Sequence, residues 1–214
     1  MLIYGRAFSF FLSLLIPFFL TRILVKEDYG SYQQLIMIYT IVQAILIFGM
    51  PQSLLYYFPR KETHEHPLLI KQTWTILLFS SLMVMAIFWL SSQIIGTHHL
   101  KEYLVLLGIY TSLMIFVMPI QNLLTLEGKI STAMWLMVFF TIIDLAVLPS
   151  AAWLNPTTLG IVHGIIVAAL LKAIMVLFHV YTTYFTKEIS GNSYIKEQLA
   201  LSLIHISEPT RLRR

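Results

Sequence analysis

Long apolar runs separated by short polar or charged segments dominate the sequence. A helix of about 20 mostly apolar residues is long enough to cross the hydrocarbon layer of a bilayer, and six runs reach that length. The pattern therefore predicts six membrane-spanning helices, at residues 2–24, 29–50, 73–95, 103–126, 130–153 and 159–185. Pro17, Pro119 and Pro149 lie inside these runs and predict kinks, which neighbouring helices can accommodate.

The connections between the predicted helices are short. The first carries the charged cluster Arg22–Asp28, where the chain returns to water, and Gly30 is expected to allow a tight turn there. Tyr29 and Tyr32 suit the headgroup level of a membrane. The longest connection, at residues 60–67, has room for a hairpin loop and for nothing larger. The fold class predicted is an all-α integral membrane bundle without a soluble catalytic domain.

Composition supports a surface that faces lipid. Charged residues make up 11% of the chain and apolar residues 58%, whereas about a quarter of a soluble domain is charged. The absence of cysteine excludes disulfides, thiolate metal sites and cysteine nucleophiles. No clustered basic face is present, which excludes nucleic acid as a partner.

The distribution of lysine and arginine predicts the orientation. The first span is longer than the apolar core of about 7–15 residues in a signal peptide and lacks a cleavage site, so we expect it to be retained. With the N-terminus inside, the inner loops carry more basic residues than the outer loops, which favours a cytoplasmic N-terminus in the cytoplasmic (inner) membrane. The inner set is Arg60, Lys61, Lys71, Lys129, Lys187 and Lys196, and the outer set is Arg22, Lys26 and Lys101.

The last segment differs from the rest of the chain. Leu201–Arg211 is similar to the translation of a transposase adapter used in preparing DNA libraries. We therefore expect residues 201–214 to be a foreign tail and residues 1–200 to be the native part.

Two ionisable residues lie near the middle of predicted spans. Lys172 is central in the sixth span, and Asp144 lies within a turn of the middle of the fifth. Charges at this depth are costly and usually line internal polar cavities. Folding about the short connection at residues 155–158 places Lys172 about 7 Å deeper than Asp144, a gap that the lysine stem can cover. The alternatives are a structural ion pair or a lysine that reaches to the interface.

Three further residues are candidates for the same cavity. Gln121 and Asn122 follow Pro119, where their amides can bond across helices or to a ligand. Arg22 ends the first span, where an arginine commonly reaches to the interface but can also face a cavity. The histidines lack the spacing of a metal site, and nucleotide-binding motifs are missing, so no metal, no cofactor and no ATP-driven motor is expected.

Several motifs point to a known family. The first span ends in Thr21-Arg-Ile-Leu24 and the second opens with Asp28-Tyr-Gly-Ser-Tyr32. Together with residues 48–60, 126–129 and 194–199, this pattern resembles the polysaccharide flippases of the MOP superfamily, along the whole of residues 1–200.

The resemblance implies a fold and a function. Members have 12 to 14 spans in two lobes around a central cavity, so this chain would be a fragment equivalent to the N-terminal lobe. They flip polyprenyl-pyrophosphate-linked oligosaccharides for surface polysaccharides such as lipopolysaccharide, with membrane lipid as the other partner. Arg22 and Lys172 would meet the pyrophosphate, and Asp144 would orient Lys172 or carry a coupling H⁺ or Na⁺.

Two alternatives remain open at this point. A cation-coupled multidrug exporter of the same superfamily would be expected to have a more acidic cavity. An integral-membrane enzyme of polysaccharide biosynthesis would need a catalytic constellation or a large outer loop, and the sequence offers neither. The expectation is therefore a transporter and not an enzyme.

Overall fold

The structure is a computed structural model that describes residues 2–46, 50–62, 64–94 and 98–185. Every regular element within these ranges is helical. In chain order they are α1 (Leu2–Ile23), α2 (Lys26–Leu46), α3 (Met50–Tyr57), η1 (Phe58–Arg60), α4 (His66–Ile94), α5 (His98–Val117), α6 (Pro119–Leu126), α7 (Ile130–Leu154), α8 (Thr158–Val180) and the π-helical turn η2 (Tyr181–Phe185). The expected tail at 201–214 lies outside the described residues.

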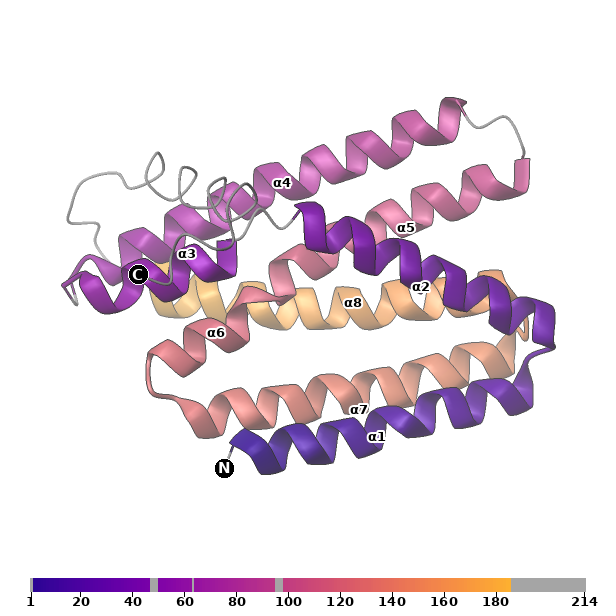
Figure 1. Cartoon of the computed structure of the whole chain (residues 1–214), viewed down its shortest axis with the longest axis horizontal. Coiled ribbons are helices and arrows are strands. Elements are labelled where there is room, and N and C mark those ends of the chain that lie inside the picture. Colours follow the sequence, from indigo (N-terminus) through magenta and orange to yellow (C-terminus); the bar gives the residue numbers. More distant parts are fainter. Residues whose placement is uncertain (1, 47–49, 63, 95–97, 186–214) are drawn as a thin grey trace, which may run out of the picture.

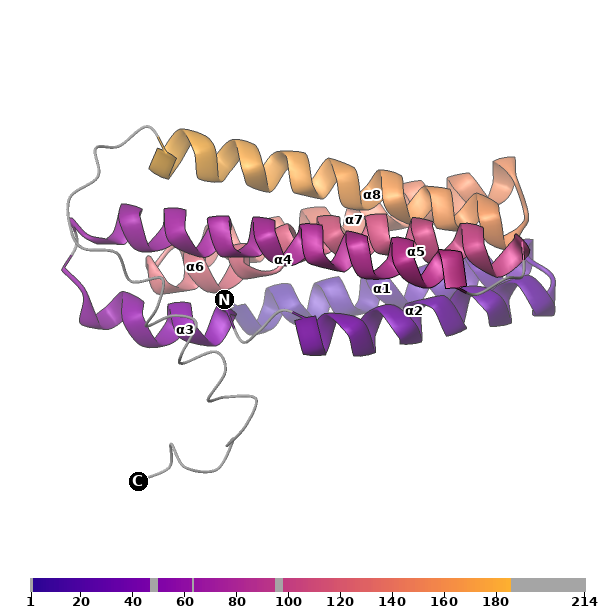
Figure 2. The same ribbon diagram turned by 90° about the horizontal axis from the view of Figure 1, so that it is seen from above.

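The long helices lie side by side in an order that differs from their order in the chain. α1 packs against α7, α7 against α8, α8 against α5 and α5 against α4, which makes one row (Figure 1). α2 contacts α5 and α8 from one side of this row, and α3 continues on the same side (Figure 2). α6 contacts α3 and α7. The row therefore brings α7 and α8 together, and α3 and α6 lie close to them.

Five helices in the described part of the chain are long and apolar enough to cross a membrane. They occupy residues 5–23, 66–94, 102–126, 130–154 and 158–185 and agree with five of the six predicted spans. The predicted second span, residues 29–50, is not among them. Its helix α2 carries Gln33, Gln34 and Gln43 along its length and ends at Leu46, and residues 47–49 lie outside the described part. The count of six spans is thus not confirmed.

The turn expected at Gly30 and the predicted start of the third span differ from the structure. The chain turns at Leu24 and Val25, and Gly30 lies exposed within α2, where a side chain would meet nothing within 4 Å. Residues 50–60 form α3 and η1, a short connection follows as predicted, and α4 begins at His66, seven residues before the predicted start of the third span at residue 73. Buried apolar side chains at residues 68–70 explain the early start, since they extend the packed face of α4.

The predicted break at Pro119 is confirmed. α5 ends at Val117 and α6 begins at Pro119, in the first turn, where proline costs no hydrogen bond. α6 ends at Leu126, and Gly128, two residues later, has a φ of 74°, the left-handed conformation that glycine adopts readily. The short α6 can therefore leave the direction of α5 and reach α7.

Two clusters of buried apolar side chains hold the bundle together. One includes Leu20, Leu148 and Ala168, and the other includes Ile120 and Ala173. Small residues allow close helix contacts, as membrane bundles require. A Cβ added at Gly108 would lie 2.7 Å from the Cβ of Phe88, so α5 approaches α4 too closely for a larger residue without a shift.

Candidate functional site

A pocket of about 510 Å³ lies between α3, α5, α6, α7 and α8. We call it the polar pocket, because its wall includes Gln121, Asn122, Thr141, Asp144 and Lys172. Four of the five sequence-predicted candidates line it. They come from α6, α7 and α8, which come together because α7 packs against both α6 and α8.

An ion pair forms one wall of the polar pocket. Lys172 Nζ donates a hydrogen bond of 2.5 Å to Asp144 Oδ1, so the lysine stem closes the gap expected from the sequence. The side chain of Lys172 is 8% exposed and that of Asp144 is 31% exposed. Lys172 Nζ also lies 5.8 Å from the centre of the Phe140 ring. The ammonium is thus held away from lipid, while its carboxylate partner remains open to the pocket.

The pair sits where the two apolar clusters meet. Ala168 belongs to one cluster and Ala173 to the other, and Lys172 lies between them on α8. Ile143, next to Asp144, packs against both clusters. A charged residue cannot continue either apolar face, so the two clusters are interrupted at this level of the bundle. The polar pocket lies at this interruption.

Three tyrosines pack beside this part of α7, although the sequence analysis placed Tyr32 at the headgroup level and did not consider Tyr39 or Tyr110. Tyr32, Tyr39 and Tyr110 pack in the apolar cluster that also includes Ile143 and Val147, which lie on either side of Asp144 along α7. Tyr32 and Tyr39 are buried on α2, and the ring centres of Tyr39 and Tyr110 are 4.5 Å apart. Their spacing along α2, seven residues, was a helical signal that they share one face. The face of α2 that carries Tyr32, Tyr39 and Gln43 therefore turns inward, while Gln34 and Thr40 are exposed.

Arg22 is not brought to the polar pocket. It is exposed in the last turn of α1, and its guanidinium lies 4.1 Å from the centre of the Phe18 ring. α1 packs on the far side of α7, which separates Arg22 from Lys172. A cavity role for Arg22 stays a prediction.

Asp28, the first residue of the motif at residues 28–32, connects the start of α2 with the start of α8. Its Oδ1 accepts hydrogen bonds from Thr158 N at 2.8 Å and from Thr158 Oγ1 at 2.5 Å. Asp28 lies in the first turn of α2 and Thr158 is the first residue of α8, so one carboxylate serves the positive ends of two helices. This contact holds the N-terminal end of α8, the helix that carries Lys172.

A second contact holds the opposite end of α8. The Tyr184 hydroxyl in η2 donates to Glu127 Oε1, and Lys129 Nζ lies 2.9 Å from Glu127 Oε2. Glu127 follows α6, so the α6–α7 turn is tied to the end of the last described helix. Both ends of α8 are anchored, which fixes the height of Lys172 relative to Asp144.

Comparisons with known proteins identify a family for this chain. The chain matches the family described as polysaccharide biosynthesis protein over residues 19–203. No curated protein and no solved structure matches the chain significantly. The match covers most of the chain, including all the pocket-lining residues. The long apolar helices and this match make the protein a multi-pass membrane protein with a role in polysaccharide biosynthesis, and the chain belongs to the polysaccharide biosynthesis protein family.

Proposed function

We propose that the protein is a transporter, not an enzyme, which flips polyprenyl-pyrophosphate-linked oligosaccharides across the cytoplasmic membrane for the synthesis of surface polysaccharides. The observation that carries the proposal is the ammonium of Lys172, held by Asp144 at the wall of a pocket within membrane-spanning helices. A pyrophosphate needs positive charge on entering a space of low dielectric constant. Lys172 would supply that charge.

The pair suggests how the charge is kept available. An unpaired ammonium that is 8% exposed would be costly in the empty pocket, and Asp144 supplies its counterion. A pyrophosphate can replace Asp144 as the partner of Lys172. Asp144 is then free to take a coupling H⁺ or Na⁺, and Gln121 and Asn122 can donate hydrogen bonds to phosphate or sugar oxygens.

The proposal includes an orientation and a place in a larger assembly. Residues 1–200 would form the first lobe of a two-lobe transporter with its N-terminus in the cytoplasm. Alternating access would then move the second lobe against the row of α1, α7, α8, α5 and α4. The matched family and the resemblance of the motif at residues 21–32 to flippases support this arrangement.

The test is Lys172→Met in the complete protein, expressed in cells that lack their own copy. Methionine is unbranched and only one atom shorter than lysine, but it carries no charge. We expect surface polysaccharide to fall at least about tenfold, the equivalent of one lost charged hydrogen bond of roughly 1.5 kcal/mol or more. The lipid-linked oligosaccharide should accumulate in the cytoplasmic leaflet, which separates a failed flippase from a failed enzyme of its synthesis.

Two controls make the result specific. Lys172→Arg keeps the charge and should retain most surface polysaccharide. Lys26→Met removes an exposed cation at the first residue of α2, outside the polar pocket, and it should leave flipping unchanged. Normal surface polysaccharide in a well-expressed Lys172→Met protein would refute the assignment.

A further inference from the structure

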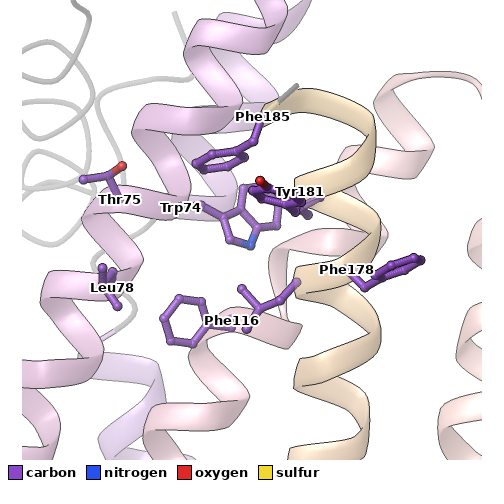
Figure 3. A pocket seen from close by; sticks show the side chains of 9 residues that line it. Trp74, Thr75, Leu78, Phe116, Phe178, Tyr181 and Phe185 are labelled. Atoms are coloured by element: carbon purple, nitrogen blue, oxygen red, sulfur yellow. The ribbon is translucent and has the colours of Figure 1, made fainter. Parts of the chain in front are cut away.

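A second pocket lies on the flank of the bundle, away from the polar pocket. It has a volume of about 500 Å³ between α4, α5, α8 and η2, and we call it the lateral pocket. Trp74, Thr75, Leu78, Phe116, Leu177 and Phe185 are among its lining residues (Figure 3). Nearly all of this wall is carbon, and it lies within helices that are apolar enough to cross a membrane. An occupant must therefore be largely apolar.

One polar atom in the lateral pocket lacks a partner. Trp74 is 3% exposed, and its Nε1 has no hydrogen-bond acceptor among the described residues. Figure 3 shows the indole in the middle of the lining side chains, with its nitrogen directed toward the side on which Phe116 lies. A buried donor without an acceptor costs about 1–3 kcal/mol. The occupant should therefore bring an acceptor to this atom.

The pocket has a cation at one end. Lys71 lies one turn before Thr75 on α4, and its Nζ is 5.7 Å from the centre of the Phe185 ring, which lines the pocket. Residues 71, 75 and 78 lie on one face of α4 and cover about 10 Å along its axis. Positive charge, a buried donor and an apolar wall therefore follow one another from the helix start toward the membrane interior.

This sequence of groups matches one kind of molecule. We propose that the lateral pocket binds a single glycerophospholipid with an anionic headgroup, in the leaflet next to the start of α4. The phosphate would lie by Lys71, an ester carbonyl would accept from Trp74 Nε1, and an acyl chain would lie along Leu78, Phe116 and Leu177. This site is separate from the polar pocket and does not depend on the flippase proposal.

The test uses the fluorescence of Trp74 in bilayers. The other three tryptophans, Trp89, Trp135 and Trp153, are more than half exposed, and they are replaced by phenylalanine in the full chain. Phosphatidylglycerol with brominated acyl chains is then mixed into phosphatidylcholine, because bromine quenches a tryptophan only on contact. A protein that keeps only Trp135, which is 63% exposed, reports the ordinary lipid shell.

We expect Trp74 to be quenched at a lower fraction of brominated phosphatidylglycerol than Trp135. Lys71→Gln should raise the half-quenching fraction about fivefold, as expected for one basic residue near an anionic lipid. Arg60→Gln, which removes an exposed cation from η1, should not change it. Brominated phosphatidylcholine should quench Trp74 more weakly than the anionic lipid, and this comparison needs no new variant.

Three results would overturn the proposal. Equal quenching of Trp74 and Trp135 would mean ordinary shell lipid, and no quenching of Trp74 would mean that a protein segment fills the lateral pocket. Recovery of Trp74 fluorescence by unlabelled polyprenyl phosphate, at concentrations where unlabelled phosphatidylglycerol has no effect, would assign the pocket to a substrate tail.

Discussion

Removing the two members of the Lys172–Asp144 pair one at a time should have unequal effects on stability. Asp144→Leu leaves an ammonium whose side chain is 8% exposed, and Lys172→Met leaves a carboxylate that is 31% exposed. The carboxylate can be hydrated through the polar pocket, which it lines. The ammonium has little access to water, and among the described residues its one further favourable contact is the Phe140 ring, 5.8 Å away.

The exposed fractions set the magnitudes. A buried charge that loses its partner costs about 3–5 kcal/mol, which applies to Asp144→Leu. For Lys172→Met the cost is reduced by solvent screening to about 1–2 kcal/mol. The double variant removes both charges and should unfold within about 1 kcal/mol of the wild type. For a domain of this size each kcal/mol corresponds to roughly 2–4 °C in Tm.

The assay is thermal unfolding of the purified protein in one detergent, with all variants measured side by side. We expect the order of Tm to be wild type and double variant highest, Lys172→Met next and Asp144→Leu lowest. Glu62→Gln is the matched control, since it removes a carboxylate whose side chain is 81% exposed and should not change Tm.

The order of the Tm values shows whether Asp144 is the hydrated member of the pair and whether the two charges stabilise each other. If Lys172→Met destabilises as much as Asp144→Leu, Asp144 is not the hydrated member of the pair. If the double variant loses as much as the two single variants together, the two charges do not stabilise each other. Either result would also remove the physical basis for an ammonium held ready by its counterion.

Two predictions concern the ends of α8. Gly160→Ala should lower Tm by several degrees, because its Cβ would lie 2.2 Å from the backbone oxygen of Asn155, whereas Gly30→Ala meets nothing within 4 Å and should keep or raise Tm. An unchanged Tm in Gly160→Ala would contradict this. Asp28→Asn should cost about 1–2 kcal/mol of unfolding free energy, because it weakens two charged hydrogen bonds to Thr158. Glu27→Gln, exposed in the same turn, is its control, and equal losses from both would refute the contact.

The sequence determined the elements that depend only on neighbours along the chain. Five of the predicted spans agree with helices. Each peptide group left without a hydrogen bond in lipid costs free energy, so an apolar run of about 20 residues forms a helix across the bilayer whatever it packs against. The break at Pro119 was predicted from the missing amide of proline, although α1 and α7 continue through Pro17 and Pro149. Lys172 and Asp144 could be chosen as candidates because a charge at mid-membrane is costly in every arrangement of the helices.

Only the tertiary structure decided which of these residues meet. Whether a side chain lines the polar pocket depends on the rotation of its helix and on its neighbours in the row, and hydropathy along the chain reports neither. This is why Arg22 could not be excluded from the pocket, and why the inward tyrosines of α2 were missed. The bond from Asp28 to Thr158 joins residues 130 positions apart, a closeness that exists only once the bundle has packed.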